Sequence, residues 1–138
     1  MMRKRWKALT LVLLLALCAA GCSKKLSDRF DRDALEEKVS TVISLAVQGD
    51  YDTLYEEEFS QQIITQIDQE SLKTAVDEVI GPLGEFQEIQ KITYMGDEDK
   101  DTETPYAIAV AVVQFQEGKA QFTLSFNLSM KCIGFWIK

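Results

Sequence analysis

Beyond residue 33, apolar residues first recur at the three- and four-residue spacing of amphipathic helices. The first stripe consists of Leu35, Val39, Val42, Ile43 and Ala46. Gly49 follows this stripe and predicts the end of the helix, because glycine adopts the left-handed C-cap conformation at little cost. A later stripe consists of Leu72, Ala75, Val76, Val79, Ile80 and Leu83. Asp68 is a suitable N-cap for this later helix, and Gly81 followed by Pro82 predicts its end.

Shorter helical segments are expected between these two stripes. Asp50 is a suitable N-cap for a short helix through Leu54 and Tyr55, and residues 62–67 suffice for one or two further turns. Residues 34–83 are therefore predicted to be mostly helical.

From Gly84 onward the apolar period changes to the alternation that is typical of β-strands. Strand-like runs cover residues 86–95, 105–116, 119–128 and 132–138. They are separated by the acidic loop GDEDKDTET, by Glu117 with Gly118, and by Ser129 with Met130. Helices followed by an antiparallel meander predict an α+β domain, with the N-terminal helices packed on one face of a four-stranded antiparallel sheet.

The strand sequences also predict how the strands pair. If Glu117 and Gly118 form a two-residue turn, small residues of the second strand face large residues of the third. These pairs are Phe115 with Ala120, Val113 with Phe122, Ala111 with Leu124, Ala109 with Phe126, and Ala107 with Leu128. If Ser129 and Met130 form the next turn, the pairs are Phe126 with Ile133, Leu124 with Phe135, and Phe122 with Ile137. Both registers place these side chains on one side, which we predict to be the core face under the helices.

The opposite side of the predicted sheet mixes apolar and polar side chains. We predict an interface there, formed by Tyr106, Ile108, Val110, Val112, Thr123, Ser125 and Trp136. The same side is expected to carry Gln121, Asn127, Cys132 and Gly134. Aliphatic residues and a tryptophan beside hydroxyls and amides are typical of association surfaces. The alternative is that a neighbouring loop or the N-terminal segment covers this side.

The first 21 residues have the layout of a secretory signal peptide. The start MMRKRWK is basic, and residues 8–20 are apolar except for Thr10, a run too short for a membrane span of about 20 residues. The segment LCAAGC, residues 17–22, resembles the bacterial lipoprotein box, although Ala19 stands where that box most often has leucine. The resemblance implies that residues 1–21 are removed and that Cys22 receives a diacylglycerol. A cleaved signal without lipid and an uncleaved span are the alternatives.

Charge changes sharply behind this anchor. Residues 22–33 are expected to form a basic tether that carries Lys24, Lys25, Arg29 and Arg32. From residue 33 onward there are 20 acidic residues and 7 lysines, a net charge of −13. Because such a surface repels phosphate backbones, we expect no nucleic-acid partner. Either the tether lies on the membrane while the acidic body is held off it, or both are simply solvated.

Few residues suggest catalysis. The chain contains no histidine, which excludes Ser-His-Asp and Cys-His arrangements. Removal of residues 1–21 and lipidation of Cys22 would leave Cys132 as the remaining free thiol. The apolar context CIGFWI predicts that Cys132 is a buried structural residue rather than a nucleophile.

The acidic loop is the one segment that resembles a metal site. Asp97, Asp99 and Asp101 alternate as at the start of a calcium loop. However, Thr102 and Ile108 occupy the positions of the expected glycine and closing acid. We therefore predict a solvated loop, with no metal and no cofactor.

Three segments resemble a known family. They are AVQGDYDTLYEEEF (46–59), LGEFQEIQKITY (83–94) and VVQFQEGKAQFTLSFNLSMKCIGFWI (112–137). Over residues 34–138 the chain resembles a small bacterial domain of unknown function, which occurs in lipoproteins and ahead of some α/β-hydrolase domains. The resemblance implies a curved sheet and a cone-shaped, cystatin-like α+β fold of the nuclear transport factor 2 superfamily. These motifs are structural rather than catalytic, so they imply no activity.

The sequence thus favours a non-catalytic binding module on the extracytoplasmic face of the cell membrane, held there by its lipid. Its ligand would be a protein or a small apolar molecule, and a second copy of the chain is one of the partners left open. One alternative is a structural self-association domain. The other is a small pocket enzyme of acid–base type, which would need a carboxyl group in an apolar pocket beside a tyrosine. The available tyrosines are Tyr51, Tyr55, Tyr94 and Tyr106.

Overall fold

The computed structural model describes residues 24–138. The helical elements are α2 (Arg32–Gln48), α3 (Tyr51–Thr53), the π-helix η1 (Leu54–Glu58), α4 (Gln61–Gln66), α5 (Gln69–Ile80) and the 3-10 helix η2 (Gly81–Leu83). The strands are β1 (Phe86–Glu98), β2 (Pro105–Phe115), β3 (Gly118–Phe126) and β4 (Cys132–Ile137). The predicted signal peptide and Cys22 lie outside the described residues. Within those residues, no helix has the length and apolar character needed to cross a membrane.

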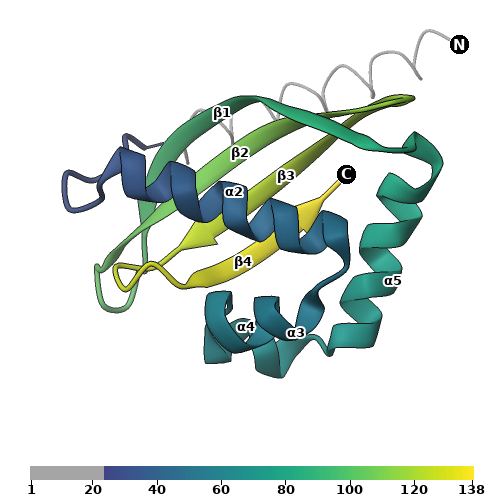
Figure 1. Ribbon diagram of the computed structural model, residues 1–138. Helices are drawn as coiled ribbons and strands as arrows, with labels where there is room; N and C mark the ends of the chain where they lie inside the picture. Colours follow the sequence, from purple (N-terminus) through teal and green to yellow (C-terminus); the bar gives the residue numbers. More distant parts are fainter. Residues whose placement is uncertain (1–23) are drawn as a thin grey trace, which may run out of the picture.

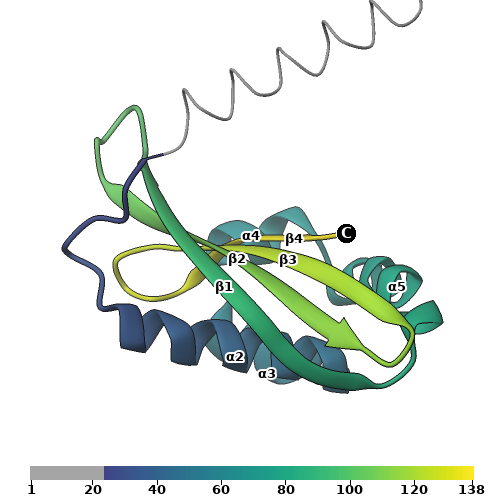
Figure 2. The ribbon, with the colours of Figure 1, turned by 90° about the horizontal axis from the view of Figure 1, so that it is seen from above.

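The four strands form one antiparallel sheet in the order β1-β2-β3-β4. Helix α2 lies across one face of this sheet, as Figures 1 and 2 show from two directions. The short helix α4 lies beside β4, and α5 stands near the end of the sheet that carries the β2–β3 hairpin. Helices that precede a four-stranded antiparallel sheet confirm the predicted α+β class.

Residues that the sequence marks as helix boundaries do cap the helices. A carboxylate oxygen of Asp68 accepts a hydrogen bond from the Ser71 N–H at 2.7 Å, at the start of α5. Gly49 ends α2 with φ 81°, in the left-handed region. The end of α5 differs, because Gly81 stays right-handed and the chain continues into η2. The turn into β1 is made by Gly84, with φ 80°.

The core lies between the helices and one face of the sheet. Helix α2 contributes its predicted stripe of Leu35, Val39, Val42, Ile43 and Ala46, all of them buried. The sheet contributes Ala107, Ala109, Ala111, Val113, Phe115, Ala120, Phe122, Leu124 and Phe126, which are also buried. The predicted core face is therefore confirmed on β2 and β3. On β4 it was wrong at Ile133, which is partly exposed and does not belong to the residues packed against the core.

The pairing of β2 with β3 differs from the predicted register by two residues, and none of the five predicted pairs forms. Phe115 pairs with Gly118, so Gln116 and Glu117 form the turn. This turn packs on η2, where the Glu117 N–H donates to the Leu83 carbonyl at 2.7 Å. A Cβ on Gly118 would lie 3.1 Å from Leu83 Cδ2, so the glycine permits this approach. A shift of two residues keeps every side chain on its face, so the predicted faces of β2 and β3 hold and only the predicted cross-strand pairs were wrong.

The pairing of β3 with β4 follows the prediction until a bulge. The predicted pairs that form are Phe122 with Ile137, and Leu124 with Phe135. A shift after Ser125 then pairs Phe126 with Cys132 instead of Ile133. The Ser60 N–H donates to the Cys132 carbonyl at 2.9 Å and holds this end of β4. The bulge turns Cys132 into the core, so its predicted place on the opposite face was wrong, whereas its predicted burial is confirmed.

Residues upstream of α2 also belong to the folded body. The Gly96 N–H donates to the Lys24 carbonyl at 2.8 Å, which attaches the N-terminal segment to β1. Leu26 packs against the core, and Phe30 is buried. Packing therefore begins before residue 34, the predicted start of the domain.

Candidate functional site

The predicted interface residues lie on the sheet face opposite α2. We call this surface the mixed face, and it consists of Tyr106, Ile108, Val110, Val112, Thr123, Ser125 and Trp136. The register aligns Val110, Thr123 and Trp136 in one row across β2, β3 and β4. The next row toward the β1–β2 loop contains Ile108 and Ser125. Trp136 is 64% exposed and the other six residues are partly exposed, so the sheet brings all seven together on one accessible surface.

A cleft of about 450 Å³ adjoins Trp136. We call it the tryptophan cleft. Its other wall comes from Ile63 and Ile67 at α4 and from Leu72 of α5. The Tyr55 hydroxyl donates to the Ile67 carbonyl at 2.7 Å and fixes the end of α4 there. Apolar side chains from both helices thus face the mixed face across the edge of β4.

A second cleft, of about 660 Å³, lies at the β1–β2 loop, and we call it the loop cleft. Its lining includes Tyr106 and Asn127 together with acidic residues, namely Asp97, Glu98 and Asp99. Ser125 and Ile133 line both clefts, so the two depressions adjoin. The surroundings change from apolar beside Trp136 to acidic at the loop.

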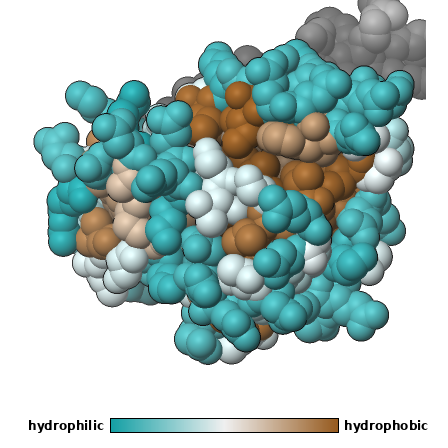
Figure 3. Space-filling model, in the orientation of Figure 1, coloured by the Kyte–Doolittle hydropathy of each residue, from teal (hydrophilic) through white to brown (hydrophobic). Residues whose placement is uncertain are grey.

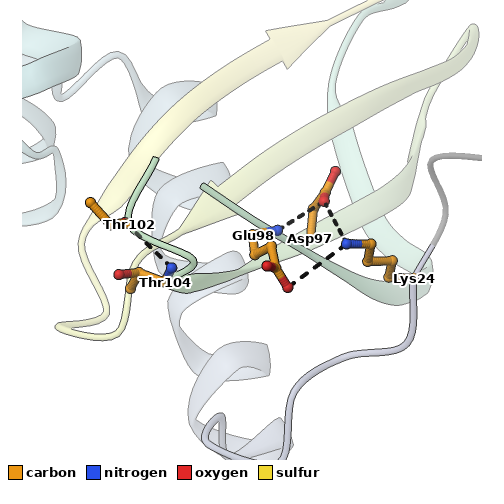
Figure 4. A network of polar contacts seen from close by, with 5 residues as sticks. All are labelled: Lys24, Asp97, Glu98, Thr102 and Thr104. Atoms are coloured by element: carbon orange, nitrogen blue, oxygen red, sulfur yellow. Dashed lines mark hydrogen bonds and ion pairs between the residues drawn. The ribbon is translucent and has the colours of Figure 1, made fainter. Parts of the chain in front are cut away.

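The carboxylates of the loop make local contacts, some of which are drawn in Figure 4. Lys24 Nζ lies 3.8 Å from a carboxylate oxygen of Asp97 and 3.8 Å from one of Glu98. Asp99 Oδ1 accepts from the N–H groups of Asp101 at 2.8 Å and Thr102 at 3.2 Å. Between residues 24 and 138, no three metal-ligating side chains are grouped so that they could hold an ion.

The space between α2 and the sheet is filled by apolar side chains. Glu58, at the end of η1, is the buried charged residue in the described part of the chain, and its carboxylate lies 3.2 Å from Lys38 Nζ. Tyr51 donates to the Ala46 carbonyl at 3.3 Å, and burial raises the pKa of Tyr51 to about 12. The core-face positions of β2 and β3 carry no acid. The buried carboxylate thus faces a lysine ammonium group.

A separate apolar area is visible from the α2 side of the molecule. Figure 3 shows hydrophobic surface beside α2 with hydrophilic surface around it. Half-buried apolar residues on this side of the sheet include Val47 of α2, Val79 of α5 and Ile89 of β1. Phe86, at the start of β1, is 40% exposed and packs edge-on against Phe115. This area and the mixed face lie on opposite sides of the sheet.

Sequence reasoning found the mixed face but missed the walls beside it. The spacing of Ile63 and Ile67 indicates an apolar helix face, yet nothing in that spacing says which strand the helix meets. The ion pairs of Lys24 were also missed, because Lys24 and Asp97 are far apart in the sequence.

Comparisons with known proteins agree with this fold. The family described as "Protein of unknown function (DUF3887)" matches residues 39–135. An NMR structure of a protein from Ruminococcus gnavus ATCC 29149 is similar, with a TM-score of 0.71 and 24% sequence identity. The similarity covers 83% of this chain and 96% of that one, and at this identity it shows the fold alone. No curated protein matches the sequence.

Proposed function

We propose that this chain, which belongs to the DUF3887 family of proteins of unknown function, is a membrane-anchored bacterial lipoprotein that acts as a non-catalytic binding module. It works outside the cytoplasmic membrane. Its mixed face and tryptophan cleft bind an apolar segment of a protein or a small apolar ligand.

The exposure of Trp136 carries this proposal. A tryptophan that is 64% exposed leaves a large apolar surface in water, which is unfavourable unless a ligand covers it. Its row on the sheet continues through Thr123 to Val110, and the apolar wall of α4 stands beside it. Large aromatic residues at the centre of such surfaces supply much of the binding energy in protein interfaces.

The charge of the loop cleft restricts the ligand. Asp97, Glu98 and Asp99 line this cleft next to the tryptophan cleft, with Lys100 among them. A ligand that extends from Trp136 toward the loop therefore meets mainly negative charge. Neutral or basic groups suit that end better than phosphates or carboxylates, because like charges repel.

The proposal includes the superfamily of the fold and the lipid on Cys22. We place the domain with the cone-shaped folds of the nuclear transport factor 2 superfamily, and the helices lying on one face of an antiparallel sheet support this. The lipid on Cys22 is supported by the sequence LCAAGC, with its basic and apolar stretches upstream.

A neutral apolar dye tests the binding site directly. Beyond residue 21 the chain has a single tryptophan, Trp136, so tryptophan emission reports on this cleft alone. Nile red should bind the domain of residues 24–138 and accept energy from Trp136. Trp136→Ala removes this donor, so dye binding to the variant is followed through the emission of the dye itself. It should be about tenfold weaker, a factor that corresponds to about 1.4 kcal/mol, because the main aromatic contact is lost.

Phe86→Ala is the matched control, because Phe86 is the other large exposed apolar residue in the described chain and lies on the opposite side of the sheet. This variant should bind the dye like the wild type. If Phe86→Ala weakens binding and Trp136→Ala does not, the apolar area beside α2 is the site and the mixed face is not. Sedimentation of both variants tests whether the ligand is a second copy of the chain. Dimers that weaken in Trp136→Ala but not in Phe86→Ala would identify a second copy as the partner.

A further inference from the structure

The N-terminal segment is attached to the outer edge of the sheet through both its backbone and a side chain. Lys24 forms an antiparallel bridge with Gly96, with the Gly96 N–H donating to the Lys24 carbonyl at 2.8 Å. The ammonium group of the same lysine lies between the carboxylates of Asp97 and Glu98, as Figure 4 shows. One residue is therefore held at two points.

The sequence of β1 is adapted to this attachment. A Cβ on Gly96 would lie 2.6 Å from the Lys25 carbonyl oxygen and 3.1 Å from Leu26 Cα, so glycine is required for the close approach. Leu26 then packs against the core, and Phe30 is buried just before α2 begins. The chain before α2 is thus attached to the folded body at Lys24, Leu26 and Phe30.

The direction of the bridge points the anchor to one end of the molecule. Because the bridge is antiparallel, the amino end of Lys24 is directed toward Glu98 and the β1–β2 loop. Cys22 is two residues away in the chain, and two residues span at most about 7 Å. A lipid on Cys22 would therefore emerge next to this loop.

Resting on the lipid anchor of the proposed function, we propose that the docking of Lys24 fixes the orientation of the domain on the bilayer. The end of the sheet with the β1–β2 loop faces the lipid headgroups. The β2–β3 hairpin, formed by Gln116 and Glu117, points away from the membrane, because successive connections in a meander lie at opposite ends of the shared strand.

The charges at this end are more nearly balanced than those of the rest of the body. Lys24, Lys25 and Arg29 of the docked segment, residues 24–31, line one depression together with Asp97, Glu98 and Glu103. On the same loop, Asp99 and Asp101 add two acids and Lys100 adds one base. The body from residue 33 onward carries a net charge of −13, which anionic lipids repel.

This orientation determines where ligands enter. The loop cleft, bounded by residues 97–105, opens at the level of the headgroups. Trp136 lies farther from the bilayer, because it pairs with Thr123, two positions along β3 from Ser125 in the loop cleft. The surface that binds ligands thus extends from the headgroups at the loop cleft to Trp136, farther from the membrane.

Energy transfer to the membrane measures the orientation. The protein that a bacterium produces from the full chain is reconstituted in phosphatidylcholine vesicles that contain an acceptor-labelled lipid. A donor dye is attached through Lys100→Cys or, separately, through Glu117→Cys. The buried Cys132 of the unmodified chain serves as the labelling blank. Transfer should be severalfold more efficient from position 100 than from position 117.

Three variants test whether the docking of Lys24 causes this orientation. Lys24→Ala removes the ion pairs and Gly96→Ala displaces the segment by its new Cβ, so both should reduce the difference between the two labels. Lys25→Ala removes a neighbouring charge that forms no ion pair in the described structure and should preserve the difference.

The outcomes separate the two proposals. If the wild type does not attach to vesicles, the lipid anchor is wrong and the orientation loses its basis. If the wild type attaches but both labels give equal transfer, the anchor stands and the fixed orientation is wrong. If the difference in transfer between the two labels persists in both Lys24→Ala and Gly96→Ala, the docked segment does not fix the orientation.

Discussion

Cys132 shows how one backbone irregularity sets the chemistry of a side chain. The bulge after Ser125 turns this thiol into the core, where it donates to the Gly134 carbonyl at 3.2 Å. Burial raises the pKa of the Cys132 thiol from its ordinary value of 9.0 to about 12. Since the thiolate is the reactive form, a thiol that stays protonated behaves as a small apolar core residue.

This pKa predicts a loss of stability in mild alkali. The folded state holds the thiol proton more tightly than the unfolded state, so the unfolded chain binds fewer protons above pH 9 and stability falls as the pH rises toward 12. Urea unfolding at pH 8 and pH 10 should show a loss of about 1 kcal/mol from this thiol. Cys132→Ala should fall less over the same interval. Identical pH dependence in the two proteins would contradict the assignment.

At the scale of elements, two glycines close to helix ends have different roles. Gly49 ends α2 with φ 81°, a conformation that side chains with a Cβ avoid. Gly81 has φ −52° at the end of α5, and a Cβ there would meet nothing within 4 Å beyond its chain neighbours. One of these neighbours is Pro82, which disfavours the helical conformation in a preceding residue with a Cβ. Glycine is therefore suited to the first position by its left-handed backbone and to the second by the proline that follows.

We expect Gly49→Ala to cost more stability than Gly81→Ala. Gly49→Ala should cost about 1 kcal/mol, because alanine must adopt the left-handed conformation. Gly81→Ala should change stability by less, because the steric conflict of its Cβ with Pro82 offsets the restriction of the unfolded chain. Denaturant midpoints of the domain at one pH are sufficient as the measurement. Equal midpoints for both variants would show that the end of α2 does not need its left-handed residue.

At the scale of the whole molecule, the sheet separates two kinds of surface. One face is covered by α2 and forms the core, while the other carries the mixed face with its two adjoining clefts. The docked segment at Lys24 joins the edge of β1 near the loop cleft. A binding surface, an acidic end and the chain that leads to Cys22 thus meet in one region of the molecule.

The anchor itself is tested by Cys22→Ser. Two acyl chains on the cysteine hold a protein stably on a membrane, because each buried methylene contributes about 0.8 kcal/mol. The wild type should incorporate labelled fatty acid and sediment with membranes in the producing bacterium. Cys22→Ser should lose both properties, whereas Cys132→Ser should retain them. Acyl label that persists in Cys22→Ser would refute the lipid assignment.

The sequence by itself determined the kinds of elements, their order and the two faces of the sheet. Helical spacing, caps such as Asp68 and the alternation in the strands are local, so they are readable from residues a few positions apart. The face assignment survived a register error because a shift of two residues preserves the side of every side chain.

Only the tertiary structure decided which residues distant in the chain contact each other. Contact of Gly118 with Leu83 set the β2–β3 turn, and the hydrogen bond from Ser60 holds Cys132 at the bulge. The wall beside Trp136 and the docking of Lys24 likewise join residues that are distant in the chain. Their placement depends on how the helices pack against the sheet, and no spacing along the chain records that.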